Sequence, residues 1–288
     1  MFFRLQMRYA LSAGIEKHIF GLRKQEALMR LKQDSLDAQN ASILGESISK
    51  TYKLVLIITL MAEKSEKKII IQKDGPYLVF GNLPLQKEIA VADKDGEPEK
   101  WEKGEKYSCG ESYALCRCGG TCKSPFCDGS HTKLKFDGTE TAENKKYDEV
   151  AEEIIGPNLI LKDVQEYCST GRFCHRKGGT WELARKADLK SKEIAIQQAC
   201  DCPSGRLVAC DKNGKPFEKR VEKSIGLIED KPAGVSGPVW VQGGIEIESE
   251  NGTKYEIRNR VALCRCGKSQ NKPFCDGNHI DSEFNSEK

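Results

Sequence analysis

The sequence has little aromatic character, few histidines and no long apolar segment, and each shortage excludes a class of protein. Phe, Trp and Tyr make up 7% of the 288 residues and the mean hydropathy is −0.56, so the chain can bury only modest cores. The longest apolar run, residues 54–62, is far shorter than the ~20 residues that cross a bilayer, so no membrane span is expected. Lys and Arg number 46 against 43 Asp and Glu, and this balance disfavours a nucleic-acid partner.

Motifs that would identify an enzyme are missing as well. The sequence has no Rossmann glycine fingerprint, no Walker loop, no His-Glu-x-x-His and no cysteine in a nucleophile signature. An enzyme with its own substrate pocket is therefore less expected than a carrier or binding protein.

Cysteine is the residue that the sequence has in excess, with 13 in 288 residues, whereas histidine occurs only four times. So many thiols indicate either an oxidised secreted scaffold or an intracellular metal protein. The odd count and the tight clusters favour metal, which predicts a cytoplasmic location. Three of the four histidines adjoin these clusters: His131, His175 and His279.

The first part of the chain differs from the rest. Residues 1–62 contain no cysteine and are richer in basic than in acidic residues, so we interpret them as an N-terminal extension. Met61 is a candidate for the true start, in which case the extension is not part of the native product. Beyond it, strands are expected at 69–71 and 77–80, separated by a turn at 74–76.

An internal duplication organises the remainder. Gly75–Gly81 is echoed by Gly237–Gly243, and Tyr113–Gly119 by Val261–Gly267, while the first copy carries a longer charged loop around residues 93–106. Between the copies, a helix is expected near residues 192–199. The predicted domains are 63–145 for the first copy, 146–215 for a middle unit and 216–288 for the second copy.

Each copy ends in the same arrangement of three cysteines and a histidine. The spacing is Cys-x-Cys, eight residues, Cys, three residues, His. Cysteines one residue apart can hold a single iron, and the glycine that follows, Gly119 or Gly267, lets the chain bend around inorganic sulfide. The Cys-x3-His pair would cap a second iron from one side of a helical turn. A structural Cys3His zinc site is the alternative, although zinc sites usually pair cysteines two to four residues apart.

These residues resemble the CDGSH iron–sulfur motif. The match is complete in the first copy and departs in the second only at Asn278, where the family has a small residue such as Ser, Ala or Thr. Members bind one [2Fe–2S] cluster per motif through three Cys and one His, usually in a strand-swapped β domain that works as a homodimer. Asn278 is expected to change hydrogen bonding near His279 without removing a ligand. The ligands that the resemblance implies are Cys116, Cys118, Cys127 and His131 for one cluster, and Cys264, Cys266, Cys275 and His279 for the other.

The middle unit carries a different cysteine pattern. Cys168 and Cys174 are spaced like the outer cysteines of the bacterial ferredoxin run Cys-x2-Cys-x2-Cys, with Gly171 in the place of the middle ligand. Cys202 and Pro203 correspond to the closing Cys-Pro, and a helix should end just before Cys202 because Pro203 disfavours helical geometry in its predecessor. The unit resembles the divergent mono-cluster [4Fe–4S] domain, which also lacks the middle cysteine.

Three cysteines leave one iron of such a cluster without a protein ligand. The middle site could therefore hold a [3Fe–4S] cluster, or a [4Fe–4S] cluster whose fourth ligand is His175, Cys200 or solvent. The alternative is a degenerate remnant in which the thiols are buried and hold no cluster. Cys109, Cys122 and Cys210 have no partner at metal spacing and are expected to be spare thiols.

We therefore expect an α+β, β-rich protein in which two small CDGSH β domains flank a ferredoxin-like α+β unit. It should hold two [2Fe–2S] clusters and a third cluster, and serve electron transfer, cluster transfer or redox sensing with a redox or cluster-acceptor protein as partner. Two copies in one chain predict an internal pseudo-two-fold pair, and hence a monomer. The alternatives are an iron–sulfur subunit or domain of an oxidoreductase, and a zinc-binding interaction module, which would be colourless and lack sulfide.

Overall fold

The computed structural model describes residues 66–218 and 220–287, which belong to the second of the two units, 1–61 and 62–288, into which the chain divides. The predicted N-terminal extension and the candidate start at Met61 lie outside the described residues. The strands are β1 (Lys68–Ile71), β2 (Tyr77–Phe80), β3 (Leu85–Ala92), β4 (Pro98–Tyr107), β5 (Ser112–Leu115), β6 (Glu152–Ile155), β7 (Ile160–Asp163), β8 (Leu207–Cys210), β9 (Ser224–Asp230), β10 (Val235–Gln242), β11 (Glu246–Ser249) and β12 (Arg260–Leu263). The helices are α4 (Ser130–Lys133), α5 (Tyr147–Val150), η2 (Gln165–Tyr167), η3 (Arg176–Gly178), α6 (Thr180–Arg185), α7 (Leu189–Asp201) and α8 (Asn278–Asp281).

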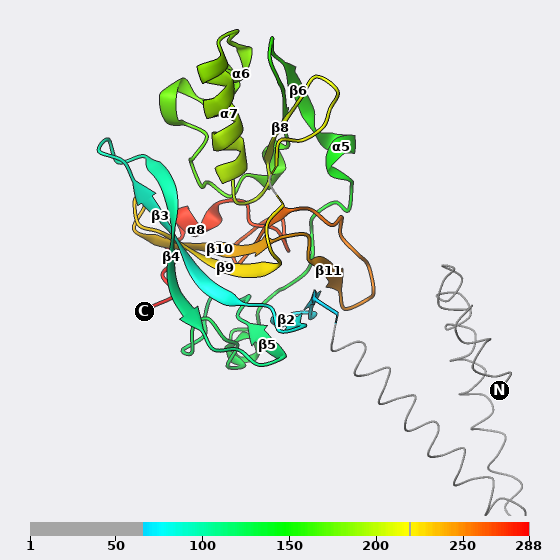
Figure 1. Cartoon of the computed structure of the whole chain (residues 1–288). Helices are drawn as coiled ribbons and strands as arrows, with labels where there is room; N and C mark the ends of the chain where they lie inside the picture. Colours follow the sequence, from blue (N-terminus) through cyan, green and yellow to red (C-terminus); the bar gives the residue numbers. More distant parts are fainter. Residues whose placement is uncertain (1–65, 219, 288) are drawn as a thin grey trace, which may run out of the picture. The chain divides into compact units, whose positions relative to one another are not determined.

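Two sheets hold the duplicated copies together, and each sheet contains strands from both. The first sheet has the order β11-β1-β2-β5 and the second the order β12-β10-β9-β3-β4. The copies meet at a parallel pair in each sheet, where Ile69 lies opposite Ile247 and Leu85 opposite Ile225. Figure 1 shows the long β3-β4 hairpin of the first copy, whose strand β3 pairs with β9 of the second copy. The copies thus exchange strands within one chain.

A shared apolar core follows from the alternation along these strands. Ile69 and Ile71 on β1 are fully buried, and so are Tyr77 and Val79 on β2, because alternate side chains of a strand face the same side of the sheet. The same core includes Ile225 from the second copy. Each such side chain stabilises the fold by roughly 1.5–3 kcal/mol on burial, so the two copies depend on each other for their core.

The charged segment 93–106 was predicted as a loop, which holds only for the turn at 93–97 and was wrong for the rest. Residues 98–107 form β4, which pairs with β3 at the edge of the second sheet. Its charged side chains face solvent, while Trp101 packs against Phe173 and Trp240, with ring centroids 4.5 and 5.0 Å apart. Charge is common on an edge strand because it discourages pairing with another chain, so a charged sequence and a strand are compatible here.

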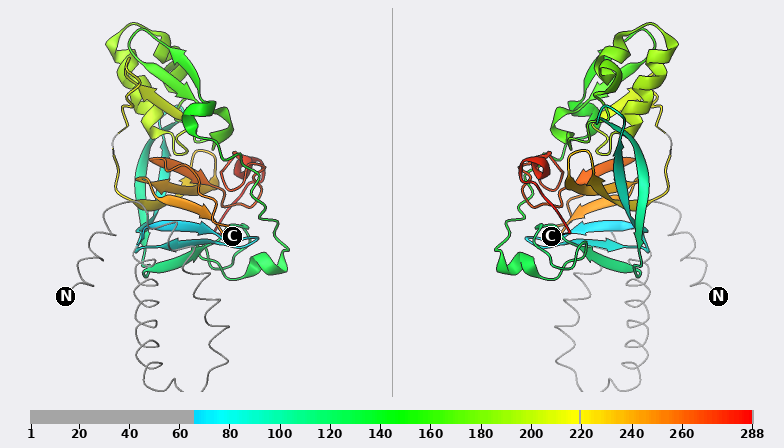
Figure 2. Two further views of the ribbon diagram at one scale, coloured as in Figure 1. Left: turned by 90° about the vertical axis from the view of Figure 1, so that its right-hand side faces the viewer. Right: turned by 90° about the vertical axis from the view of Figure 1, so that its left-hand side faces the viewer.

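The middle unit forms a separate three-stranded sheet, β6-β7-β8, with α6 and α7 packed against it. The predicted helix is confirmed and is longer than expected: Asp188 caps it by accepting a hydrogen bond from the Ser191 N–H at 2.8 Å, and it ends at Asp201, directly before Cys202. Figure 2 shows this green unit at one end of the two larger sheets. The described residues confirm a strand-rich α+β fold.

Candidate metal centres

The first centre consists of Cys116, Cys118 and Cys127, in the loop that follows β5, and His131, in α4. The Cys116 N–H donates to the Pro125 carbonyl and the Cys127 N–H to the Ala114 carbonyl, both at 2.9 Å, so the two arms of the loop are tied together. The sulfurs of Cys116 and Cys118 lie 3.7 Å apart, and the Cys127 sulfur lies 3.4 Å from Nδ1 of His131. The structure therefore brings the four predicted ligands together as two pairs.

The second centre repeats this geometry with Cys264, Cys266 and Cys275, in the loop that follows β12, and His279, in α8. The Cys264 N–H donates to Pro273 at 2.8 Å and the Cys275 N–H to Ala262 at 2.9 Å. The Cys264 and Cys266 sulfurs are 3.8 Å apart, and the Cys275 sulfur is 3.4 Å from Nδ1 of His279.

These separations suit metal ligation. Two thiolates at about 2.3 Å from one tetrahedral metal lie about 3.8 Å apart, and a thiolate and an imidazole nitrogen lie about 3.6 Å apart. In the described residues, no three or more His, Cys, Asp and Glu side chains form a group suited to a single ion. Each loop instead offers a Cys–Cys pair and a Cys–His pair, the arrangement that a binuclear group requires.

An aspartate, rather than a helical turn, sets the Cys-x3-His spacing. The helices begin at Ser130 and Asn278, after the third cysteine of each loop, so the helical-turn argument was wrong. Asp128 accepts hydrogen bonds from the Cys122 and Ser130 N–H groups at 2.8 and 3.0 Å, which folds the turn that carries His131. Asp276 does the same in the second loop.

Asn278 adds hydrogen bonds, as expected. Its side-chain amide donates to the Lys268 carbonyl at 3.2 Å and to Asp276 at 3.0 Å, while His279 keeps its place beside Cys275.

The two centres lie against each other through their glycines. Gly119 has φ +76°, and a Cβ there would lie 2.5 Å from the Cys266 carbonyl oxygen. Gly267 has φ +78°, and its Cβ would lie 2.6 Å from the Cys118 carbonyl oxygen. Only glycine fits such a reciprocal contact, which adds a second reason for these glycines to the predicted bend around sulfide.

The middle site gathers three predicted cysteines. Cys168, Cys174 and Cys202 line one cavity of about 20 Å³, together with Arg206. Burial, followed by the charges of Cys202 and Cys168, raises the pKa of the Cys174 thiol to about 12, as expected for thiols that lie close together. The cavity has room for about one water, so a four-iron cluster requires these side chains to move apart.

The predicted candidates for a fourth ligand at the middle site do not line this cavity. His175 lies beside Trp181, with ring centroids 6.3 Å apart, and the Cys200 carbonyl accepts a hydrogen bond from Arg260 at 3.1 Å. Gly171 packs on Pro203, since a Cβ there would lie 3.1 Å from the proline Cδ. This contact gives a physical reason for the missing middle cysteine.

Comparison with protein-family models agrees with this geometry. The family described as iron-binding zinc finger, CDGSH type, matches residues 74–132 and 236–280, and the family described as divergent 4Fe-4S mono-cluster matches residues 154–212. The chain thus carries two CDGSH regions around one divergent 4Fe-4S region. It is an iron–sulfur protein. No curated protein and no solved structure matches it.

The electrostatics of the two CDGSH centres favour a thiolate at one cysteine of each Cys-Arg-Cys. A hydrogen bond from Cys118 lowers the pKa of Cys116 to about 6, and one from Cys266 lowers that of Cys264 to about 6. The same hydrogen bonds raise the pKa of Cys118 and of Cys266, so each pair favours one thiolate, the form that binds metal. Burial lowers the pKa of His279 to about 4, which keeps its ring neutral and able to donate a nitrogen lone pair.

The surroundings of the two CDGSH centres differ. In the second centre, Cys264, Cys275 and His279 are no more than 3% exposed, whereas Cys118, Cys127 and His131 in the first are partly exposed. The middle unit provides the cover, because a Cβ on Gly277 would lie 2.6 Å from Thr170.

The arginine inside each Cys-Arg-Cys was not predicted to have a role, although its recurrence at matching positions of the two copies indicates one. Arg117 is buried and donates to the carbonyls of Gln72 and Gly138 at 3.2 and 2.5 Å. Arg265 is buried against Glu229, at 2.8 Å. Each arginine thus anchors its ligand loop to another part of the fold.

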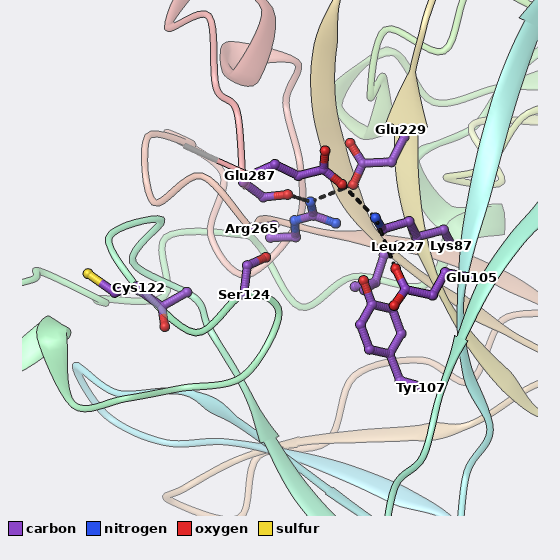
Figure 3. Close-up of a pocket in the computed structure, with 11 residues that line it drawn as sticks. Lys87, Glu105, Tyr107, Cys122, Ser124, Leu227, Glu229, Arg265 and Glu287 are labelled. Atoms are coloured by element: carbon purple, nitrogen blue, oxygen red, sulfur yellow. Dashed lines mark hydrogen bonds and ion pairs between the residues drawn. The ribbon is translucent and has the colours of Figure 1, made fainter.

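Arg265 also lines a cavity of about 300 Å³ between strands of both copies (Figure 3). Lys87 pairs there with Glu287 and Glu105, at 2.5 and 3.2 Å. With Glu229, three carboxylates oppose two cations, so the cavity is not suited to an anion.

None of the helices in the described ranges combines the length and apolar composition needed to cross a lipid bilayer.

Proposed function

We propose that this chain is an electron-transfer protein with one [2Fe–2S] cluster in each CDGSH centre and a third, [4Fe–4S] or [3Fe–4S], cluster at the middle site. The observation that carries the proposal is the reciprocal contact of Gly119 with Cys266 and of Gly267 with Cys118, which puts the two ligand sets side by side. When bound, such a cluster accepts or releases one electron without forming or breaking a substrate bond. The pairing of ligands within each loop supports a binuclear group.

The chain's own residues would hold and adjust these groups. Cys116 and Cys118 hold one iron, and Cys127 and His131 hold the other, with the matched residues in the second centre. A neutral histidine in place of a thiolate reduces the negative charge and raises the reduction potential. At the middle site, Arg206 lines the cavity with the three cysteines and is held by two hydrogen bonds to Asp163, at 2.6 and 2.9 Å.

We further propose a monomer in a cytoplasmic compartment. The exchange of β3-β4 and β11 between the copies supports a monomeric state, because one chain supplies both CDGSH copies of the strand-exchanged pair. No disulfide joins the cysteines of the described residues, which supports a compartment that keeps thiols reduced.

Cluster transfer to an acceptor protein is the second candidate, favoured by the partial exposure of the ligands of the first CDGSH centre. Incubation of the loaded chain with an apo-ferredoxin separates the two. Electron transfer leaves iron and sulfide on the chain, whereas cluster transfer moves both to the acceptor.

Anaerobic absorption spectra with iron and sulfide analysis test the proposal. Each CDGSH centre should contribute two irons and two labile sulfides, and Cys116→Ala and Cys264→Ala should each remove one centre's share. Cys122→Ser is the matched control, since this exposed thiol is not a ligand and its loss should leave the iron content unchanged. Zinc without sulfide would refute the proposal.

The middle site needs its own test. Cys168→Ala should abolish a paramagnetic signal distinct from that of the CDGSH pair, while Cys210→Ser, which alters a buried thiol outside the site, should preserve it. If Cys168→Ala changes neither the iron content nor the spectrum, the middle site is a remnant.

A further inference from the structure

The segments that follow the two histidines differ in charge. From the second residue after the histidine, the first copy has three exposed residues that are basic or apolar, where the second copy has exposed acidic and polar ones. The matched residues are Lys133 and Asp281, Leu134 and Ser282, and Lys135 and Glu283. In the preceding loop, Lys123 of the first copy corresponds to Asn271 of the second, whereas Gly120 and Ser124 correspond to Lys268 and Lys272, so the charge difference lies in the segment after the histidine.

Leu134 places an apolar contact at the edge of the first centre. Its side chain is 58% exposed, yet it lies against the ligand loop, because a Cβ on Gly120 would be 2.2 Å from Leu134 Cδ1 and 3.9 Å from the Cys118 sulfur. A single exposed leucine needs no explanation on its own. Here it lies beside a metal ligand, with lysines on both sides of it in the sequence.

The middle unit covers the second centre but not the first. Thr170 lies against Gly277, and Asn271 donates to the Glu166 carbonyl at 3.0 Å. At the matched glycine of the first centre, Gly129, a Cβ would have nothing within 4 Å. An external protein can therefore approach the ligands of the first centre more closely than those of the second.

We propose that the face formed by Lys123, Lys133, Leu134 and Lys135 is the docking surface for an acidic redox protein. This inference rests on the proposed electron-transfer function and adds to it the place of exchange and the kind of partner. Opposite charges steer the encounter and raise its rate, while an apolar residue near the centre of the contact is buried on docking. The acidic face at Asp281 and Glu283 would repel the same partner.

A protein fits this face better than an anionic membrane does. Binding to anionic lipid usually uses clusters of about four to eight basic residues. Here three lysines stand near two exposed acids, Asp128 and Asp137, so the charge is mixed. An apolar residue with charged residues around it fits the apolar core and polar rim of a protein contact.

The test uses the full chain loaded with iron–sulfur clusters, and reduced flavodoxin, an acidic flavin protein, as the probe. The flavin hydroquinone is oxidised by one electron and the chain is reduced by one electron, which stopped-flow absorbance follows at increasing sodium chloride concentration. We expect the second-order rate to fall with salt. The double variant Lys133→Asp/Lys135→Glu should lower the rate at low salt by about ten-fold.

A control with the same change in net charge keeps this test specific. Lys186→Asp/Lys190→Glu alters exposed lysines of the middle unit and should leave most of the rate. A rate that is independent of salt, or that falls equally in both double variants, overturns the proposal. Binding to anionic vesicles that is lost in Lys133→Asp/Lys135→Glu, with an unchanged flavodoxin rate, also overturns it and assigns the face to a membrane.

Failure of the underlying function gives a different result. A chain without iron and sulfide, or whose absorbance does not bleach with dithionite, fails before flavodoxin is added. A chain that bleaches with dithionite but shows no charge dependence with flavodoxin refutes the docking surface alone.

Discussion

Arg260 links the strand that leads into the second CDGSH centre to the middle unit, and Arg260→Met should strongly destabilise the chain. Its Nη1 donates to the carbonyls of Ala199 and Cys200 at 2.6 and 3.1 Å, at the C-terminal end of α7, and its Nη2 pairs with Glu218. Carbonyls at a helix end lack helical partners and lie at the negative end of the helix dipole, so a buried guanidinium satisfies both needs.

The expected loss follows from burial. The Arg260 side chain is 5% exposed and that of Glu218 is 16% exposed, and removing one partner of a buried ion pair costs about 3–5 kcal/mol because the other charge is left unpaired. Methionine retains much of the apolar packing of the arginine stem. For a unit of this size, the loss corresponds to a fall in Tm of roughly 6–20 °C.

Thermal unfolding followed by far-ultraviolet circular dichroism measures this shift. The matched control is Arg185→Met, which removes an exposed pair with Glu182 and should cost less than about 1 kcal/mol. If Arg260→Met lowers Tm no more than Arg185→Met does, the link between the middle unit and the second centre does not bear on stability and the reasoning is refuted.

Three further predictions concern pH, backbone packing and access. Burial raises the pKa of Glu88, so the Glu88 carboxyl binds its proton more tightly in the folded state than in the unfolded state. The free energy of unfolding should therefore fall as the pH rises above 4.5. Glu88→Gln should flatten this pH dependence, as measured by urea unfolding. Gly156→Ala would place a Cβ 1.8 Å from the Ala184 carbonyl oxygen and should lower the urea midpoint far more than Gly110→Ala, where the nearest atom is 3.9 Å away. An iron chelator should bleach the first CDGSH centre faster than the second in variants that keep only one, since burial by the middle unit slows access; equal rates would contradict this.

Local features of the fold were predictable because neighbouring residues determine them. The strands at 69–71 and 77–80 follow from apolar runs on either side of a Gly-Pro turn, and the end of α7 follows from Pro203. The 98–107 strand was missed because its charges obscure the alternation and because the hairpin that it forms with β3 pairs with β9, which is far away in the sequence.

The same contrast between local and distant contacts applies to the candidate metal centres. The ligand pairs could be predicted from spacing, since the turn that positions His131 is closed by hydrogen bonds between residues only a few positions apart, such as the one that the Ser130 N–H donates to Asp128. The cover that Thr170 forms over Gly277 joins residues over a hundred positions apart, and no local pattern indicates it.

This difference between local and distant determinants bears on how the two copies can act. The hydrogen bonds that shape each ligand loop lie within that loop. Strand exchange and the insertion of a middle unit could therefore change the surroundings of one centre without moving its predicted ligands. The matched distances between ligand atoms in the two loops agree within 0.1 Å. Identical ligand sets in unlike surroundings should differ in accessibility and in potential, since burial and nearby charge both alter a centre's redox properties. The second centre, beneath the middle unit and beside the Arg172–Asp230 ion pair, is therefore suited to an internal position in electron transfer, and the first, with its ligands partly exposed, to exchange with another protein.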